Sequence, residues 1–441
     1  MARRHAGLEL LDELKRAAAR AGADRRVRAL LLLCRRLLSE RGEANSVAIA
    51  SDLVAGFAAL EAVSRERFFA HLAHDFDPDP QAVLASAQAY AREPTAAHLM
   101  QLTSSAEPPR QELLRRINRL PGGTAHIVAM RRALLPLLLK QPELAAVEAD
   151  FLHLLGSWFN PGFLRLQRVD WHAPAQLLEQ LIRHEAVHAI DGWDDLRRRL
   201  QPDRRCFAFF HPQLPDEPLI FVEVALLPEM PAAIAPLIAK ASQAQPPGGF
   251  KVAAFYSISN CQPGLRGVSL GHFLIKRVAG ELQREWPRLK TFCTLSPIPG
   301  LARWLRAGAP CEGLSRLRAQ RLAQALQTLL RACSGDPDTL ADAATLQRLP
   351  APATDALQQL ATLYLVHASP GAGGDPVARF HLDNGARLER LNPLADLSAK
   401  GLRQSFGMMV NYLYDLQKVE AHHEQFVQGE VAHSRKIAAW L

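Results

Sequence analysis

The chain has 441 residues, of which 48% are hydrophobic and 22% are charged, a composition typical of globular proteins and not of disordered or fibrous ones. Lys and Arg number 52 against 44 Asp and Glu, and this mild excess, a net charge of +8, suits an anionic ligand as well as it suits an ordinary solvated surface. No Lys/Arg-dense stripe with interleaved aromatic residues is present, and no apolar run reaches the roughly 18 residues of a membrane-spanning helix, so we expect neither nucleic acid nor a membrane as a partner.

The N-terminal segment and the cysteines predict a cytoplasmic protein. The first forty residues are rich in Arg but also contain acidic residues, whereas transit peptides are poor in acids, and their apolar stretches are too short for a secretory signal. The six cysteines form no CxxC pair, so neither a zinc ribbon nor a thioredoxin-like site is expected. Scattered cysteines of this kind are typical of buried small side chains in a reducing compartment.

Residues 1–175 predict a bundle of helices. Apolar residues recur at helical spacing over 8–38, with an expected break near Gly22, and Asp77-Pro78-Asp79-Pro80 is a signal that ends one helix and starts another. Further helical patterns follow over 81–91, 111–120, 125–139 and 144–159. Because reactive side chains do not cluster in this half, we expect it to have a structural or oligomeric role.

Residues 176–441 predict a mixed α+β domain. Two strands are expected over 205–210 and 219–226, joined by a turn-rich segment that makes them an antiparallel pair. A third strand over 252–259 leads through a Gly-rich loop into an amphipathic helix over 274–286, and a short strand over 291–295 follows. Helical patterns return over 314–333 and 353–364. We therefore expect an all-helical domain followed by a mixed-sheet domain.

The loop over 262–271 is the strongest local signal for a ligand. Its glycines let the backbone approach a phosphate closely, and the helix that follows directs free N–H groups at the same place. The loop is neither a Walker A motif nor the dinucleotide-binding GxGxxG motif. The spacing Arg266-x-x-x-x-Gly271 is instead similar to the pyrophosphate loop of the GCN5-related acetyltransferase fold, which grips coenzyme A. A Gly-rich turn between strand and helix that binds nothing is the alternative.

A second motif, His184-Glu185-Ala186-Val187-His188, matches the HExxH pattern of zinc peptidases. A pattern with so few fixed positions arises by chance in many chains. Gly192 and Trp193 follow soon after it and shorten any helix, and no clear third ligand is present downstream. We therefore favour a helix end with two ordinary histidines, and expect no metal.

Three single residues are chemically suggestive but are weak signals by themselves. Ser296 ends a strand and is held by flanking prolines, yet a serine in such a turn more often caps backbone groups. His381 is expected in a strand before a hairpin turn at residues 383–385, where a lone histidine is usually structural. Glu223 lies in the middle of a strand and requires a partner if that strand is central.

Long motifs over about residues 110–415 resemble the malonyl-CoA decarboxylase family, and such a set in this order does not arise by chance. The motifs are Pro121-Gly122-Gly123, Trp158-Phe159, Gly162-Phe163-Leu164, Phe255-Tyr256-Ser257-Ile258-Ser259, Gln262, Gly264-Leu265, Gly267-Val268, Leu270-Gly271, Phe273-Leu274-Ile275-Lys276, Leu295-Ser296-Pro297-Ile298-Pro299-Gly300, Trp304-Leu305, Phe380-His381-Leu382, Asn384-Gly385-Ala386 and Met409-Val410-Asn411-Tyr412.

The resemblance implies a helical N-terminal domain and an acetyltransferase-like catalytic domain, in homo-oligomers that are dimers or tetramers. It implies that Ser296 and His381 are the catalytic pair and that no metal takes part. It also implies a malonyl-CoA site with the loop amides on the pyrophosphate, formed by Arg266, Gly267, Val268, Ser269, Leu270, Gly271 and His272. Some relatives carry a glutamate where this chain has Ser269, so a carboxylate role at that position is not carried over.

The implied reaction is decarboxylation of malonyl-CoA to acetyl-CoA and CO2 without a cofactor. The thioester carbonyl accepts the electrons that CO2 leaves behind, which gives an enolate. We expect His381, because histidine titrates near neutrality, to protonate the enolate carbon, while Ser296 binds the departing carboxylate or the carbonyl oxygen. The alternative is an acyl-CoA-dependent N-acyltransferase on the same fold with Glu223 as its base, and a zinc peptidase built on the HExxH motif ranks below it.

Overall fold

The computed structural model describes residues 2–268, 270, 274–369 and 374–441, and its contacts divide the chain into two compact units. The first contains Met1–Leu164, His211–Pro215 and Gln262–Leu270, and the second contains Arg165–Phe210, Asp216–Cys261 and Gly271–Leu441. The domain boundary expected after residue 175 lies inside the second unit, because Arg165–Val169 forms a strand of its sheet.

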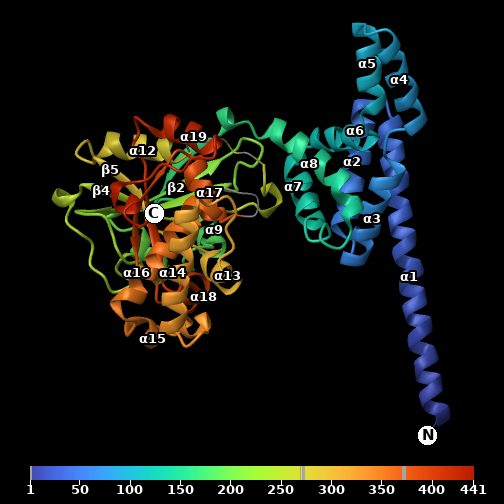
Figure 1. Ribbon diagram of the computed structural model, residues 1–441. Coiled ribbons are helices and arrows are strands. Elements are labelled where there is room, and N and C mark those ends of the chain that lie inside the picture. Colours follow the sequence, from blue (N-terminus) through green and yellow to red (C-terminus); the bar gives the residue numbers. More distant parts are fainter. Residues whose placement is uncertain (1, 269, 271–273, 370–373) are drawn as a thin grey trace. The chain divides into compact units, whose positions relative to one another are not determined.

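The first unit is built from helices, as its apolar periodicity predicts (Figure 1). They are α1 (Ala2–Ser39), α2 (Glu43–Ala58), α3 (Ala62–Asp75), α4 (Pro80–Arg92), α5 (Ala96–Ala106), α6 (Pro109–Asn118), α7 (Gly123–Leu134) and α8 (Ala145–Trp158). The stop-and-start signal is confirmed, since α3 ends before it and Asp79 caps α4 by accepting a hydrogen bond from the N–H of Gln81. The break expected near Gly22 is wrong. Helix α1 continues through it, because one glycine costs a helix only about 1 kcal/mol.

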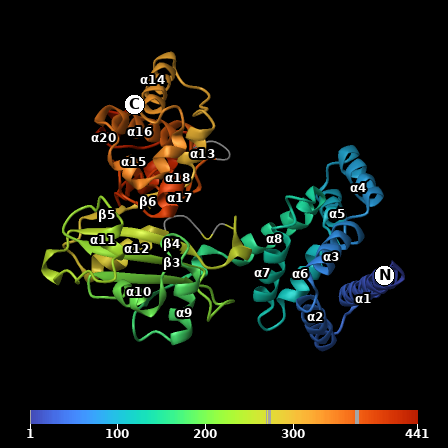
Figure 2. The same ribbon diagram turned by 90° about the horizontal axis from the view of Figure 1, so that it is seen from below.

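The second unit is built on a mixed sheet (Figure 2). Its strands are β1 (Arg165–Val169), β2 (Arg204–Phe210), β3 (Ile220–Leu227), β4 (Val252–Asn260), β5 (Thr291–Thr294), β6 (Ser296–Pro297), β7 (Arg387–Asn392) and β8 (Met409–Leu413). Their order among the described residues is β1-β2-β3-β4-β5-β8-β6, and β7 also pairs with β8. Strands β4 and β5 are parallel, which requires a crossover, and α12 (Leu274–Glu285) lies between them in the chain. The expected α+β class, a helical region followed by a mixed-sheet domain, is confirmed.

Helices cover both faces of this sheet, so its central strands are buried on each side (Figure 2). On one face α9 (Ala175–His184) and α10 (Gly192–Arg199) pack against Cys206, Ala208 and Phe210. On the other face Arg277 of α12 lies over the ring of Phe209 at 5.4 Å. The remaining helices are α11 (Ala235–Ile238), α13 (Leu301–Arg306), α14 (Arg316–Ala332), α15 (Ala343–Gln347), α16 (Ala351–Leu363), α17 (Pro376–Asp383), α18 (Ala399–Ser405), α19 (Val419–Val427) and α20 (Arg435–Ala438).

Two findings on the described residues concern membrane-spanning helices and disulfides. Among the described residues, none of the helices combines the length and the apolar character that spanning a bilayer requires. All six cysteines belong to the described part of the chain, and none of them is in a disulfide.

Candidate active site

Ser296 begins β6, a two-residue strand that pairs antiparallel with β8. Its backbone is opposite Val410, and Pro297, which has no N–H to donate, is tolerated next to it because β6 is at the end of the strand order. The side chain is buried, and its Oγ donates a hydrogen bond to Oγ1 of Thr294 at 2.9 Å. The sheet therefore fixes the position of this hydroxyl.

His381 lies on α17, so the strand and hairpin expected at this place are wrong. The Asn384-Gly385 pair ends the helix: Gly385 has a φ of 77°, which suits a residue without a side chain. The N–H groups of Gly385 and Ala386 donate to the carbonyls of Leu382 and His381, the pattern of a Schellman motif. The same two residue types that favour a hairpin turn thus terminate a helix here.

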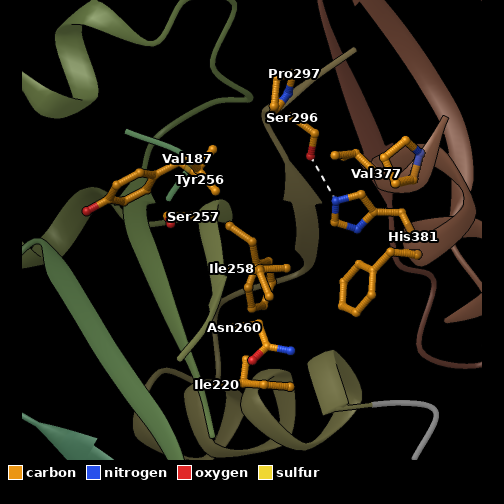
Figure 3. Close-up of a pocket in the computed structure, with 13 residues that line it drawn as sticks. Val187, Ile220, Tyr256, Ser257, Ile258, Asn260, Ser296, Pro297, Val377 and His381 are labelled. Carbon is orange, nitrogen blue, oxygen red and sulfur yellow. Dashed lines mark hydrogen bonds between the residues drawn. The ribbon is translucent and has the colours of Figure 1, made fainter. Parts of the chain in front are cut away.

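A chain of hydrogen bonds joins Ser296, His381 and Tyr414, and Figure 3 shows the bond between the first two. Nε2 of His381 is 2.9 Å from Oγ of Ser296, and Nδ1 is 2.8 Å from Oη of Tyr414. Because the serine hydroxyl donates to Thr294, it accepts from the histidine, and this places the imidazole proton on Nε2. Nδ1 then accepts the phenolic proton of Tyr414. The expected pair, Ser296 and His381, is brought together by strands and a helix far apart in the sequence.

Burial controls the charge of His381, since it lowers the pKa of the imidazole to about 3. The expectation that this histidine titrates near neutrality is therefore wrong. At neutral pH the ring is uncharged, and the proton it can offer is the Nε2 proton of the neutral tautomer.

Ser296 and His381 line a cavity of about 260 Å³ whose walls are mostly apolar (Figure 3). The other lining residues are Val187, Ile220, Phe255, Tyr256, Ser257, Ile258, Asn260, Pro297, Pro376, Val377 and Phe380. Neither Lys nor Arg is among these described lining residues. A carboxylate that enters the cavity loses water without gaining a cationic partner from them, which favours its departure as uncharged CO2.

The HExxH motif does not form a helix, because α9 ends at His184. Glu185 instead ties the segment after α9 to the sheet: its Oε1 accepts from the N–H groups of Val187 and His188 at 2.7 and 2.8 Å, and its Oε2 accepts from Ser257 at 2.6 Å. Burial lowers the pKa of His188 to about 4. Within the described residues, no group of three metal-ligating side chains is found. The motif supports the wall of the cavity that Val187 lines.

Glu223 has the partner that its central position requires. Strand β3 lies between β2 and β4, and the buried carboxylate accepts a hydrogen bond from Arg199 at 2.9 Å in an ion pair. Burial raises the pKa of Glu223 to about 7, against the opposing effect of Arg199. Glu223 does not line the cavity, so a role as the base of an acyltransferase has no support from its position.

The described part of the Gly-rich loop packs within the first unit. Arg131 of α7 donates to the carbonyls of Gly264 and Arg266 at 2.7 and 2.6 Å, and a Cβ atom at Gly264 would lie 2.2 Å from a backbone oxygen of α7. Arg266 is exposed and Gly267 has a φ of 80°, whereas Val268 and Leu270 are buried. Ser269, Gly271 and His272 lie outside the described residues. Binding of malonyl-CoA by this segment stays a prediction.

Sequence reasoning missed Tyr414, although a signal for it exists. Tyr412 lies in β8 and Tyr414 directly follows the strand, so their side chains share one face. Both contact His381: the ring of Tyr412 stacks on the imidazole at a centroid distance of 4.6 Å, and Tyr414 forms the hydrogen bond to Nδ1. The available clue was that Tyr414 is aromatic and lies two residues after Tyr412, the last residue of a family motif.

Comparisons with known proteins match both parts of the chain. A family model described as the malonyl-CoA decarboxylase C-terminal domain matches residues 162–441, and one described as the malonyl-CoA decarboxylase N-terminal domain matches residues 76–159. The mitochondrial malonyl-CoA decarboxylase of Rattus norvegicus is 34% identical over 405 residues, 86% of this chain and 82% of that protein. The crystal structure of malonyl-CoA decarboxylase from Rhodopseudomonas palustris is 45% identical, with a TM-score of 0.83, and covers 94% of this chain and 99% of its own. That from Agrobacterium vitis is 44% identical, with a TM-score of 0.79, and covers 93% and 99%.

Proposed function

The chain belongs to the malonyl-CoA decarboxylase family and is an enzyme that converts malonyl-CoA to acetyl-CoA and CO2, and we propose that Ser296 and His381 carry out this reaction. The observation that carries the proposal is the 2.9 Å contact between Oγ of Ser296 and Nε2 of His381 at the wall of a mostly apolar cavity. The hydroxyl and the imidazole N–H thereby reach the same small volume.

The proposed reaction begins when the bond between the substrate's α-carbon and its carboxylate breaks. The electron pair moves into the thioester, which becomes an enolate, and the Ser296 hydroxyl turns from Thr294 to donate its hydrogen bond to the departing carboxylate or to the carbonyl oxygen. The Nε2 proton of His381 then passes to the α-carbon, while Nδ1 takes the phenolic proton of Tyr414. After the product leaves, Nδ1 returns the phenolic proton to Tyr414 and Nε2 takes a proton from solvent, so the resting tautomer is restored and each turnover takes up one proton.

This route needs no metal or organic cofactor, because the thioester carbonyl is itself the electron acceptor. For substrate binding we propose the segment from Arg266 to His272. The support from its described part is the pair of hydrogen bonds by which Arg131 holds the carbonyls of Gly264 and Arg266, since a fixed loop costs less entropy on binding.

For assembly and location we propose a homo-oligomer, a dimer or tetramer, in the cytoplasm. Large apolar side chains are exposed on the first unit, with Met100 at 73% and Leu139 at 93%, and an interface between copies would cover such residues. The absence of disulfides among the six described cysteines is consistent with a reducing compartment. Light scattering of the purified chain measures its oligomeric state, and a monomer at assay concentrations contradicts the proposed homo-oligomer.

The decisive experiment follows CO2 release from malonyl-CoA by the purified chain in the presence of a chelator. We expect full turnover with the chelator and a loss of about 100- to 10,000-fold in kcat for His381→Ala, the usual contribution of a general acid. Ser296→Ala is tested in the same assay, and the exposed His433→Ala is the matched control, expected to keep its kcat.

Two outcomes contradict the assignment. A folded His381→Ala variant with near-normal turnover removes the histidine from the mechanism. A Ser296→Ala variant that changes only KM reduces the serine to ground-state binding.

A further inference from the structure

The buried carboxylate of Asp375 divides its two oxygens between two parts of the second unit. Oδ1 accepts from the N–H groups of Val377 and Ala378 at 3.0 and 3.1 Å, and so caps the helix α17. Oδ2 accepts from the N–H of Gly300 at 2.9 Å and lies 3.4 Å from Oη of Tyr364. One side chain therefore holds the start of a helix and a separate turn.

These two parts carry the two residues of the proposed pair. Gly300 lies in the turn that follows β6, the strand that Ser296 begins, and Asp375 precedes the helix on which His381 lies about one and a half turns later. Ser296 and His381 are 85 residues apart in the chain, so chain connectivity does not set their separation. The Asp375 carboxylate sets this separation directly, because a shift of α17 relative to the turn would break a hydrogen bond to one of its two oxygens.

The packing around Gly300 leaves little room for such a shift. A Cβ atom at this position would lie 2.0 Å from Oη of Tyr364 and 3.2 Å from Oδ2 of Asp375. The ring of Tyr364 also packs against Trp304 of α13, with a centroid distance of 5.1 Å. The turn, the tyrosine and the carboxylate thus form a close-packed contact.

We propose that Asp375 is a positioning residue that sets the geometry of Ser296 and His381 by joining the turn at Gly300 to the N-terminus of α17. The proposal rests on the proposed function, since it assigns Asp375 to the pair named there. The proposed role of Asp375 goes beyond that of a helix cap. Capping uses only Oδ1, whereas the hydrogen bond that Oδ2 accepts from the N–H of Gly300 connects the helix to the turn.

Asp375→Asn separates the two tasks of the side chain. The amide oxygen keeps the acceptor for Val377 and Ala378, and the NH2 group then faces the N–H of Gly300, where two donors repel each other. We expect kcat for malonyl-CoA to fall about 10- to 100-fold, the effect of a displacement of roughly 1 Å between reacting groups, with KM nearly unchanged. Asp342→Asn is the matched control, because Asp342 caps α15 through Thr345 in the same way and lies on an exposed turn.

A double-mutant cycle distinguishes positioning from general stability. If Asp375 acts through Ser296, then Asp375→Asn causes little further loss of kcat in a Ser296→Ala background. Asp375→Ser, whose hydroxyl still caps α17 but leaves the N–H of Gly300 without an acceptor, must give the same pattern and decides the matter if the Asn variant does not fold.

The proposal is overturned if either folded variant keeps wild-type kcat, or if the loss is equally large in both backgrounds. Failure of the proposed function is seen separately, because Ser296→Ala and His381→Ala would then retain turnover whatever Asp375 does.

Discussion

At the scale of single residues, two tyrosines contact the ring of His381 in different ways. Tyr414 forms a hydrogen bond of 2.8 Å with Nδ1 and, by donating to it, stabilises the tautomer that points the Nε2 proton at Ser296. Tyr412 stacks on the imidazole, and its buried hydroxyl has no hydrogen-bond partner among the described residues. One hydroxyl therefore controls the proton on the ring, and the other does not.

Tyr414→Phe should lower kcat about 100-fold, the lower end of what a general acid contributes, because Nδ1 loses the group that fixes the tautomer. Tyr412→Phe keeps the stacked ring and removes only an unpartnered hydroxyl, so its kcat should match that of the wild type. Single-turnover measurement of CO2 release compares the two. Equal effects of both variants contradict a special role for Tyr414.

The residues of the site were predictable to different degrees for physical reasons. Ser296 and His381 lie inside motifs that are contiguous in the sequence, and the structure brings them together as expected. Asp375 acts through contacts made by helix placement, which local patterns do not encode, whereas the alternation of Tyr412 and Tyr414 indicates a shared face but not its contact with His381. The neutral state of His381 could not be predicted from the sequence either, because it follows from burial and not from residue type.

At the scale of elements, Glu185 holds the segment that follows α9 against the sheet. Its two oxygens accept three hydrogen bonds, from the N–H groups of Val187 and His188 and from the hydroxyl of Ser257. Val187 and Ser257 both line the cavity, so this carboxylate sets the shape of one wall.

Glu185→Ala should weaken both the fold and substrate binding. Each polar group left buried without a partner costs about 1–3 kcal/mol, so the free energy of unfolding should fall by several such increments, and KM for malonyl-CoA should rise as the wall loosens. Glu185→Gln is the matched control, since its amide oxygen accepts from both N–H groups and its NH2 donates to Ser257. Urea unfolding and steady-state kinetics test this. A Gln variant as impaired as the Ala variant would show that charge, and not hydrogen bonding, matters.

Elements with a strong period of their own were predictable, and elements that depend on neighbours were not. Helix α12 and strands β2, β3 and β4 appear where the apolar pattern places them. Strand β1 was expected to be helical, and α17 was expected to be a strand before a hairpin. Asn-Gly is common both in hairpin turns and after helices, so only the surrounding contacts decide between the two.

At the scale of the whole molecule, the two compact units do not follow the order of the chain, because the first unit includes short segments that lie in the sequence among residues of the second. The helical half and the mixed sheet were predictable from composition and periodicity. The assignment of His211–Pro215 and Gln262–Leu270 to the first unit was not, because it results from packing between segments distant in the sequence. Arg131, for example, bonds to Gly264 and Arg266 more than a hundred residues later.

Two buried histidines of the second unit make its stability depend on pH. Burial lowers the pKa of His188 to about 4 and that of His381 to about 3. The nearby Asp396 opposes the shift at His188, whereas Arg199 and Lys400 add to it. In the unfolded chain both histidines have the usual histidine pKa of about 6.5, so on acidification the unfolded state binds protons that the folded state does not. Their contribution to stability is thus complete above that value and is lost as the pH falls toward 4 and 3.

We expect each histidine to reduce the free energy of unfolding by about 1.4 kcal/mol per pH unit below its unfolded pKa, or about 4 kcal/mol for the pair at about pH 5. His188→Gln removes one of the two groups and should remove about half of this slope, as measured by urea unfolding across that range. His172→Gln is the matched control, because the His172 side chain is 96% exposed and should leave the slope unchanged. A His188→Gln variant whose stability falls with pH as steeply as that of the wild type contradicts the assignment, because protonation of His188 would then not be what destabilises the fold in acid.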